Sequence, residues 1–246
     1  GRQPLQLSRF ENLGLCSRGS CRWKSQSRMV LKKPVYGDSM GTNIQMDSIK
    51  TVFTTAYFPS IAYLKAYFSE QDCHIEIHET YLKQTIRNRC EILSSNGIQR
   101  MTVPVIRVHG SKTKTKDIEI EMGKWQNDHW RAIQSAYAAA PYFEDYAEDI
   151  HHIIYKSPKH LIALNENILE FICGILDMPF KAKNTTTYAI AQHNDSRNTD
   201  FMTRTNMKKY QQVFGYDREF TPNLSVIDLL FNEGPFMRKW ILNQKS

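Results

Sequence analysis

The pattern of hydrophobic and polar positions divides residues 51–242 into a first half rich in predicted strands and a second half rich in predicted helices. Runs of β-branched residues and strict apolar–polar alternation are typical of strands. On these patterns, strands are predicted over residues 51–56, 73–78, 90–93, 101–108 and 117–122. Asn96-Gly97, between two of these apolar runs, predicts a hairpin turn.

Helical spacing of apolar residues marks one segment among these strands and most of the chain after residue 124. Ile61, Leu64 and Phe68 share one helix face, and Ser60 is suited to cap a helix over residues 61–69. Further helices are predicted over residues 125–139, 142–155, 160–176 and 224–232, the last opened by Pro222-Asn223 and closed by Gly234-Pro235. Between them, residues 181–222 are polar apart from a candidate strand at 185–190.

These elements predict a single domain of α+β or mixed α/β class, with hairpins in a strand-rich N-terminal half and a helical C-terminal flank. Residues 1–45 differ from the rest because they show neither the helical nor the strand spacing of apolar residues. They are expected to form a disordered basic leader, or to be extraneous if the natural chain starts near Met46. The folded domain is then expected over residues 46–246.

Net charge separates the same two parts. Residues 1–45 contain eight lysines and arginines against Glu11 and Asp38, so they carry +6 of the formal net charge of +7. Because the remainder is nearly neutral, no nucleic-acid partner is expected. No apolar run reaches the roughly 18 residues of a membrane helix, and the first residues lack the apolar core of a signal peptide. A cytoplasmic protein without membrane insertion is therefore expected.

Cysteines and histidines give little sign of a metal site. Cys16, Cys21, Cys73, Cys90 and Cys173 form no CxxC pair, and the last three lie among apolar residues, where buried free thiols are expected. On a strand, His74 and His78 would lie roughly 13 Å apart, too far to share one ion. No metal site is predicted.

The segment Tyr81–Ile92 concentrates cations and amides. If it is extended, its odd positions place Lys83, Arg87 and Arg89 on one face, with Gln84 and Asn88 between them. Such side chains can hold a phosphate, a carboxylate or sugar hydroxyls. The alternative is a solvated edge strand whose charges prevent aggregation.

Two further segments suggest ligand chemistry. Tyr57 lies in a strand–turn–helix segment whose helix N-terminus favours anions, although its ring could equally be part of the core. His129 follows Trp125 near the start of a predicted helix, where the helix dipole is expected to lower its pKa. A neutral imidazole can act as a general base, and simple packing is the alternative.

Taken in order, several segments resemble the WbqC-like protein family of bacterial polysaccharide gene clusters. The matching pieces are Ala56–Leu64, His78–Arg89, Met101–Val105, Trp125–His129, Tyr137 with Ala140–Phe143 and Tyr146, and Pro222–Asn232. Many members have Gln-Pro after the first strand and a glycine in the next helix, where this chain has Thr55-Ala56 and Ala62. A role for that glutamine is therefore not carried over.

The resemblance implies work on sugar precursors of O-antigen, capsule or a related glycan. Acyl or aminoacyl transfer to an amino sugar or nucleotide-linked sugar fits this setting. Lys83, Arg87 and Arg89 would then hold a pyrophosphate or carboxylate, Gln84 and Asn88 would bind hydroxyls or amides, and His129 would take the acceptor's proton. The alternative is a non-catalytic protein that binds a nucleotide sugar or scaffolds the pathway, with Tyr57, Tyr63, Trp125, Tyr142 and Phe143 stacking on the sugar. No particular cofactor is indicated.

Overall fold

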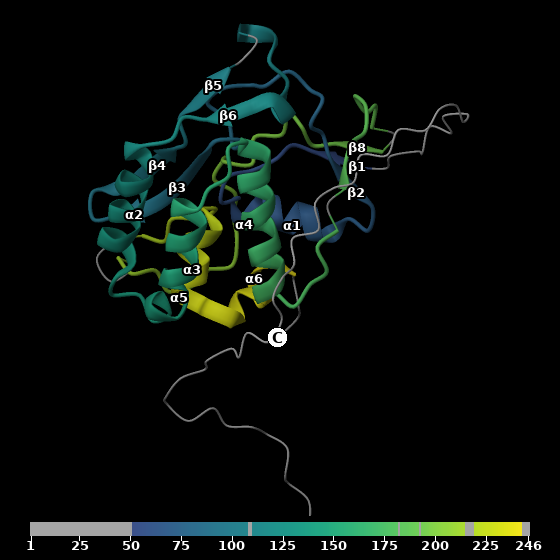
Figure 1. The fold of residues 1–246 in the computed structure, drawn as a ribbon. Helices are drawn as coiled ribbons and strands as arrows, with labels where there is room; N and C mark the ends of the chain where they lie inside the picture. The colour runs from purple at the N-terminus through teal and green to yellow at the C-terminus, as the bar shows by residue number, and fades with distance from the viewer. Residues whose placement is uncertain (1–50, 108–109, 182, 192, 215–218, 243–246) are drawn as a thin grey trace, which may run out of the picture. The chain divides into compact units, whose positions relative to one another are not determined.

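The computed structural model describes residues 51–107, 110–181, 183–191, 193–214 and 219–242 (Figure 1). The expectations for residues 1–45 lie outside this part of the chain. Strands are β1 (Thr51–Phe53), β2 (Cys73–Ile75), β3 (Arg89–Ser94), β4 (Gly97–Thr102), β5 (Val105–Arg107), β6 (Ile118–Ile120), β7 (Lys183–Asn184) and β8 (Asn194–Asp195). Helices are α1 (Ile61–Ser69), α2 (Lys124–Tyr137), α3 (Phe143–Tyr155), α4 (Leu161–Ile175), α5 (Val226–Glu233) and α6 (Arg238–Ile241).

A four-stranded parallel sheet in the order β7-β2-β1-β8 organises the domain. The chain passes from β1 through α1 to β2 on one side, adds β7 beyond β2, and then returns to place β8 on the other side of β1. The strand order therefore reverses between β1 and β8. In open parallel sheets, ligands bind at the carboxyl ends of the strands beside such a reversal.

Two antiparallel hairpins accompany this sheet. In β3–β4, Ser94 pairs with Gly97 across a two-residue turn, and Gly97 has a φ of 105° that suits glycine. The second hairpin pairs β5 with β6, from Val105 opposite Ile120 to Arg107 opposite Ile118. The predicted mixture of strands, hairpins and a helical C-terminal region is confirmed.

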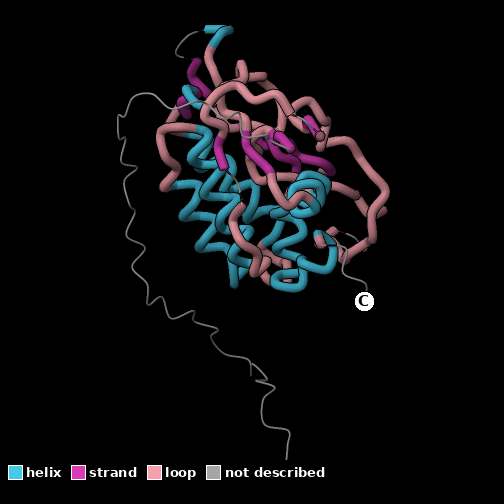
Figure 2. The backbone as a smooth tube through the Cα atoms, turned by 90° about the vertical axis from the view of Figure 1, so that its right-hand side faces the viewer, coloured by secondary structure: helices cyan, strands magenta, loops and turns pink. Residues whose placement is uncertain are grey.

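The helices gather on one side of the strands in the view of Figure 2. α1 has the predicted bounds, and the Ser60 hydroxyl accepts a hydrogen bond from the Tyr63 N–H as its N-cap. α4 buries Leu161, Leu164 and Ile168 at helical spacing. Within the described residues, no helix has the length and apolar character needed to cross a bilayer.

Three local predictions are wrong. The extended conformation considered for the segment 81–92 is absent before Arg89, where pairing begins, because residues 83–88 form turns and a bend. The candidate strand at 185–190 is absent, since β7 ends at Asn184. Ser225, rather than Pro222-Asn223, caps the last long helix by accepting from the Ile227 N–H. The first error matters most, because a turn no longer places alternate side chains on one face.

Candidate functional site

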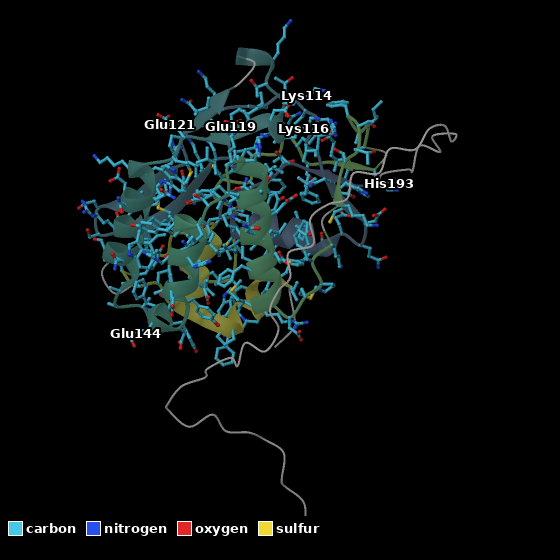
Figure 3. All side chains as sticks on the ribbon, in the orientation of Figure 1. Lys114, Lys116, Glu119, Glu121, Glu144 and His193 are labelled. Atoms are coloured by element: carbon cyan, nitrogen blue, oxygen red, sulfur yellow. The ribbon has the colours of Figure 1, made fainter. Side chains whose placement is uncertain are left out.

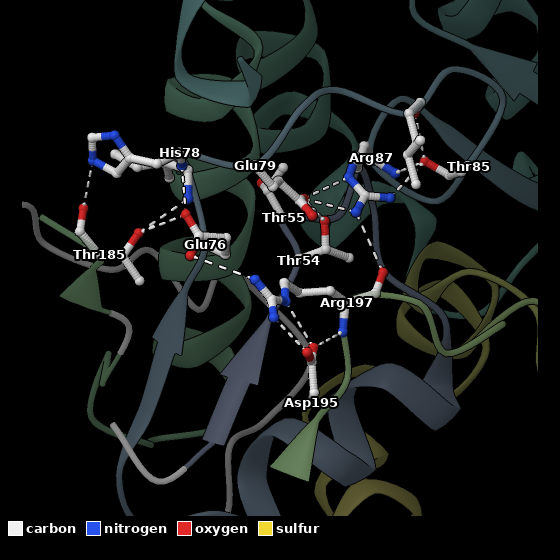
Figure 4. A network of polar contacts seen from close by, with 12 residues as sticks. Thr54, Thr55, Glu76, His78, Glu79, Thr85, Arg87, Thr185, Asp195 and Arg197 are labelled. Carbon is white, nitrogen blue, oxygen red and sulfur yellow. Dashed lines mark hydrogen bonds and ion pairs between the residues drawn. The ribbon is translucent and has the colours of Figure 1, made fainter. Parts of the chain in front are cut away.

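The carboxyl ends of the four parallel strands carry a connected set of polar side chains. Thr54 follows β1, Glu76 and Glu79 follow β2, Thr185 follows β7, and Arg197 follows β8. Figure 4 shows these side chains meeting at one edge of the sheet. The parallel topology brings them together, because all four strands point toward the same edge.

Arg87 reaches this edge from the turn that precedes β3. Its Nε and Nη2 atoms lie 2.9 and 2.7 Å from Glu79 Oε1. Nη1 donates to the Thr85 hydroxyl at 3.1 Å, and Nη2 also donates to the Arg197 carbonyl at 3.3 Å (Figure 4). Only 1% of Arg87 is exposed. Most of its N–H groups are therefore used to fix the turn against the sheet.

Glu76 and Arg197 form a second buried pair on the same edge. Glu76 is fully buried and accepts from the His78 N–H, the Thr185 hydroxyl and the Ala189 N–H. Arg197 Nη1 lies 3.8 Å from Glu76 Oε2, while Nε donates to Asp195 at 2.8 Å (Figure 4). The hydrogen bond from Arg197 lowers the pKa of Asp195 and keeps it ionised.

A cleft of about 300 Å³ lies between the turn at 82–87 and the loop at 197–202. Its volume is at the lower end of the range for small-molecule sites. It is lined by Leu82, Gln84, Thr85, Ile86, Arg87, Arg197, Asn198, Thr199, Asp200 and Met202. The loop follows β8, so the cleft lies at the carboxyl end of β8. This is the strand next to the point between β1 and β8 where the strand order reverses.

The cleft offers polar groups that the fold does not use. Gln84, Asn198 and Thr199 are exposed, and their side chains make no hydrogen bond within the described part of the chain. Asp200 holds its own loop by accepting from the Met202 N–H and the Thr203 hydroxyl, at 3.0 and 2.8 Å. Each of its oxygens can still accept a further bond. Amide, hydroxyl and carboxylate groups together suit a ligand with several hydroxyls.

Gln84 has an unusual backbone conformation, with a φ of 65°. Side-chain-bearing residues are rare in this left-handed region and are strained there. The bonds that fix Arg87 and Thr85 hold the turn in place. The strain therefore coincides with the side chain that projects at the mouth of the cleft.

Within the segment 81–92, the predicted binding residues separate into different environments. Lys83 is exposed in the same turn as Gln84. Asn88 is buried, and its Nδ2 donates to the Val103 carbonyl at 2.9 Å. Arg89 is half-buried at the start of β3 and lines a separate cavity of about 10 Å³. The prediction that Lys83, Arg87 and Arg89 share one face is wrong, because the turn rotates Arg87 inward.

His129 lies within an aromatic cluster of the core. Only 5% of it is exposed; its Nδ1 lies 2.9 Å from the Tyr57 hydroxyl, and its ring centroid is 5.0 Å from that of Trp125. Burial lowers the pKa of His129 to about 4. The expected direction is confirmed, but desolvation is the leading cause rather than a helix dipole. None of the three residues lines the cleft.

Two aromatic candidates also lie elsewhere. Tyr63 is buried in α1 and donates through its hydroxyl to the Thr54 carbonyl at 2.7 Å. Tyr142 lies before α3, where Gly234 leaves room for its ring: a Cβ atom on Gly234 would lie 2.5 Å from Tyr142 Cδ1. Tyr142 is not among the cleft residues.

Arg197, Asn198, Thr199 and Asp200 were not predicted from the sequence. They lie in the weakly patterned stretch 181–222, where neither periodicity nor motif spacing marks a site. Their position depends on β8 pairing with β1, from which it is separated by 140 residues. The available signal was a polar Asp195–Asp200 run after a two-residue strand, which is too short for pattern analysis.

Charges of both signs are interspersed on the described surface. Lys114 and Lys116 lie near Glu119 and Glu121 around β6 (Figure 3), and Lys159 pairs with Glu119 at 2.8 Å. Among the residues that the structure describes, no cluster of three or more His, Cys, Asp or Glu side chains is arranged to hold a metal ion.

The model of the WbqC-like protein family matches residues 55–215. The chain belongs to the WbqC-like protein family. The match includes both sides of the cleft, the turn at 82–87 and the loop at 197–202.

One relative of this WbqC-like protein is an uncharacterized protein, Rv1507c, from Mycobacterium tuberculosis. It is 29% identical over 210 residues, which cover 72% of this chain and 88% of the relative. No solved structure matches the chain. The relative's name assigns no activity, so a function has to be argued from the site itself.

Proposed function

We propose that this WbqC-like protein is a transferase of surface-polysaccharide biosynthesis that acts on an amino sugar or nucleotide-linked sugar bound in the cleft. The observation that carries the proposal is the set of uncommitted side chains, Gln84, Asn198 and Thr199, around a cleft of about 300 Å³. Sugar recognition needs several donors and acceptors at fixed positions, and amides supply both. The resemblance to a family expected to act on precursors of surface polysaccharides suggests the same class of substrate.

The two arginines have different roles from those expected for an anion site. Arg87 is engaged with Glu79, and Arg197 with Asp195 and Glu76, so neither is free to neutralise a phosphate. Lys83 is exposed, stands next to the cleft residue Gln84 in the sequence, and forms no ion pair within the described residues, so its ammonium group is free for an anion. We assign positioning to the arginines and anion contact to Lys83.

The transfer step needs a base near the acceptor. Asp200 is the carboxylate that lines the cleft, whereas the His129 ring lies in the core with Nδ1 against Tyr57. In the proposed reaction, the acceptor nitrogen or oxygen attacks the carbonyl carbon of an activated acyl or aminoacyl donor, and the bond to the leaving group breaks. Asp200 takes the proton that the acceptor loses and passes it to the leaving group.

A non-catalytic sugar-binding or scaffold protein is the second candidate. It is favoured by the lining itself, since no Cys, His or Ser is among the residues around the cleft to serve as a nucleophile. The two candidates differ in what Asp200 does. It is a base in the first, and a loop-holding residue that accepts from Met202 and Thr203 in the second.

Binding is tested by thermal unfolding of the full chain with N-acetylglucosamine, UDP and UDP-linked N-acetylglucosamine as separate probes. A ligand at 100 times its dissociation constant stabilises a protein by about 2.7 kcal/mol. We expect the sugar-containing probes to stabilise the wild-type protein. Thr199→Ala should lower the affinity for these probes at least ten-fold. Thr205→Ala, at an exposed threonine outside the cleft lining, is the matched control. Equal affinities in both variants would contradict the proposal.

Catalysis is tested with Asp200→Asn. If the protein is a transferase, this variant keeps sugar binding but loses turnover of acyl donors by at least a hundred-fold, within the range for removal of a general base. Asp177→Asn, at a fully exposed carboxylate, is the control. Unchanged turnover in Asp200→Asn would show that Asp200 is not the general base. Absence of turnover in the wild type would favour the second candidate, a non-catalytic sugar-binding protein.

A further inference from the structure

A second, small cavity is lined in part by Asn165, whose side-chain amide donates to the Arg87 carbonyl. It has a volume of about 10 Å³, room for one water-sized group. Its walls include Thr55, which follows β1, and Asn165 and Glu166 in α4, with apolar contacts from Pro59 and Leu169. Thr55 follows β1, so this cavity lies at the same carboxyl edge of the parallel sheet as the cleft.

Asn165 occupies a position in α4 that its neighbours fill with apolar side chains. Leu161, Leu164 and Ile168 are buried on this helix face, and only 2% of Asn165 is exposed. A buried amide is unfavourable unless its polar atoms are bonded. A buried asparagine in this apolar stripe is therefore expected to make hydrogen bonds through its amide.

Half of those bonds are present. Asn165 Nδ2 donates to the Arg87 carbonyl at 2.9 Å and to the Thr55 hydroxyl at 3.0 Å. The carbonyl partner fixes the orientation of the amide, since only its NH₂ group can donate. Asn165 Oδ1 is buried and has no partner among the described residues. One acceptor at this cavity is thus left for a donor from outside the chain.

Glu166 adds a negative charge to the same cavity. The residue is partly exposed, its carboxylate accepts from Asn184 Nδ2 at 2.5 Å at the surface, and it forms no ion pair within the described residues. An unmatched carboxylate beside an unmatched amide oxygen forms an acceptor-rich environment. A cationic donor satisfies both groups, whereas a neutral hydroxyl leaves the charge uncompensated.

We propose that this cavity binds a primary ammonium group, held by Asn165 Oδ1 and the Glu166 carboxylate. An ammonium group is close to water in size, so it fits the volume, and the apolar walls suit the carbon that carries it. This inference rests on the proposed function for its substrate class, because the group would belong to an aminoacyl donor or to an amino sugar whose hydroxyl group is the acceptor. Arg87 joins the two sites: its carbonyl holds Asn165, and its side chain lines the cleft.

The test compares ligands that differ in one charge, on the full chain at mildly acidic pH. Ethylammonium probes the cavity alone, N-acetylglucosamine probes the cleft alone, and glucosamine presents the same sugar with a free ammonium group. Binding is followed by calorimetry and by the NMR resonances of the Asn165 side-chain amide. The variant is Glu166→Gln, and the matched control is Glu170→Gln, an exposed glutamate one turn further along α4.

We expect glucosamine to bind at least ten-fold more tightly than N-acetylglucosamine, with the preference lost in Glu166→Gln and kept in Glu170→Gln. Ethylammonium and glucosamine should shift the Asn165 resonances. Equal binding of both sugars, with no effect of Glu166→Gln, would overturn the ammonium site and leave the proposed sugar-binding function standing. Ethylammonium binding that depends on Glu166, without binding of either sugar, would support the site and contradict that function.

Discussion

Two buried carboxylates in this domain are stabilised in different ways. Glu79, at the carboxyl edge of the parallel sheet, is neutralised by Arg87, whose Nη2 lies 2.7 Å away. Asp228, in α5, is fully buried and meets no cation among the described residues. It accepts instead from the Tyr137 hydroxyl at 2.8 Å, the Tyr210 hydroxyl at 2.6 Å and Gln212 Nε2 at 2.9 Å.

The difference follows the use of each region. The neutral donors around Asp228 tie α2 and the 210–212 loop to α5, and none of these residues lines a described cavity. The charged pairs at the sheet edge instead supply Arg87 and Arg197 to the lining of the cleft, where they tie the turn at 82–87 and the loop at 197–202 to the sheet. We infer that charge is used where the chain must stay rigid beside solvent, and neutral donors where it is simply packed.

The largest expected effect is the loss of Arg87. Arg87→Met leaves Glu79 buried without its cation, and we expect the free energy of unfolding to fall by about 3–5 kcal/mol, as for other buried pairs. Urea unfolding measures the change. The double variant Glu79→Gln/Arg87→Met should recover a large part of the loss, because it removes the uncompensated charge. A double variant as unstable as the single one would contradict this account.

Asp228→Asn should cost less, about 1–3 kcal/mol, the usual range for a buried polar group left without its partner. The asparagine side chain keeps one oxygen that can accept a hydrogen bond. Its NH₂ group replaces the other oxygen and faces a donor among Tyr137, Tyr210 and Gln212. The three remaining polar partners stay neutral, so no buried charge is left behind. The same urea measurements apply, and a loss as large as that of Arg87→Met would remove the distinction between the two regions.

Acid should act on the two regions with opposite sign. Burial raises the pKa of Asp228, so its folded form takes up a proton more readily than the unfolded chain. This group therefore adds stability as the pH falls from its raised pKa toward about 4. The hydrogen bond from Arg197 lowers the pKa of Asp195, whose contribution is present above about pH 4 and is lost below it.

Unfolding free energies between neutral and acidic pH check these signs. The difference between wild type and Asp228→Asn should grow on acidification, and that between wild type and Asp195→Asn should shrink below about pH 4. The effect at Asp195 is expected to be small, since its side chain is 40% exposed and solvent screens the pair. Equal trends for the two variants would show that the carboxylates share one environment.

Local patterns predicted the elements with local causes. The Ser60 cap and the apolar face of α1 gave its bounds, and the Asn96-Gly97 signal gave the β3–β4 hairpin. These features depend on residues within one or two turns of each other. The mixed α/β class also followed, because long periodic segments distinguish helices from strands.

The site could be predicted only in part, because it depends on long-range pairing. The concentration of cations and amides in the segment marks Gln84 and Arg87, but an extended segment would not predict the turn that places them in different environments. Its stability comes from Glu79 and the Arg197 carbonyl, contacts that no local pattern encodes. The strands β7 and β8 have two residues each, so the loop at 197–202 could be placed only once the sheet order was known.

The smallest expected effect on stability is that of Gln84→Gly, and its sign is informative. Gln84 has a φ of 65°, which glycine adopts without strain. We expect the free energy of unfolding to stay level or rise by up to about 1 kcal/mol, while affinity for the sugar probes falls because the amide is lost. Gln99→Gly in β4 makes the same chemical change at an exposed strand position and should lower stability by about 0.5–1 kcal/mol without affecting binding. If both variants lost stability equally, Gln84 would carry no strain. If Gln84→Gly bound the probes as the wild type does, the Gln84 amide would have no part in sugar binding. The cleft and the Asp228 region would then differ only in how their buried carboxylates are stabilised, by a cation or by neutral donors.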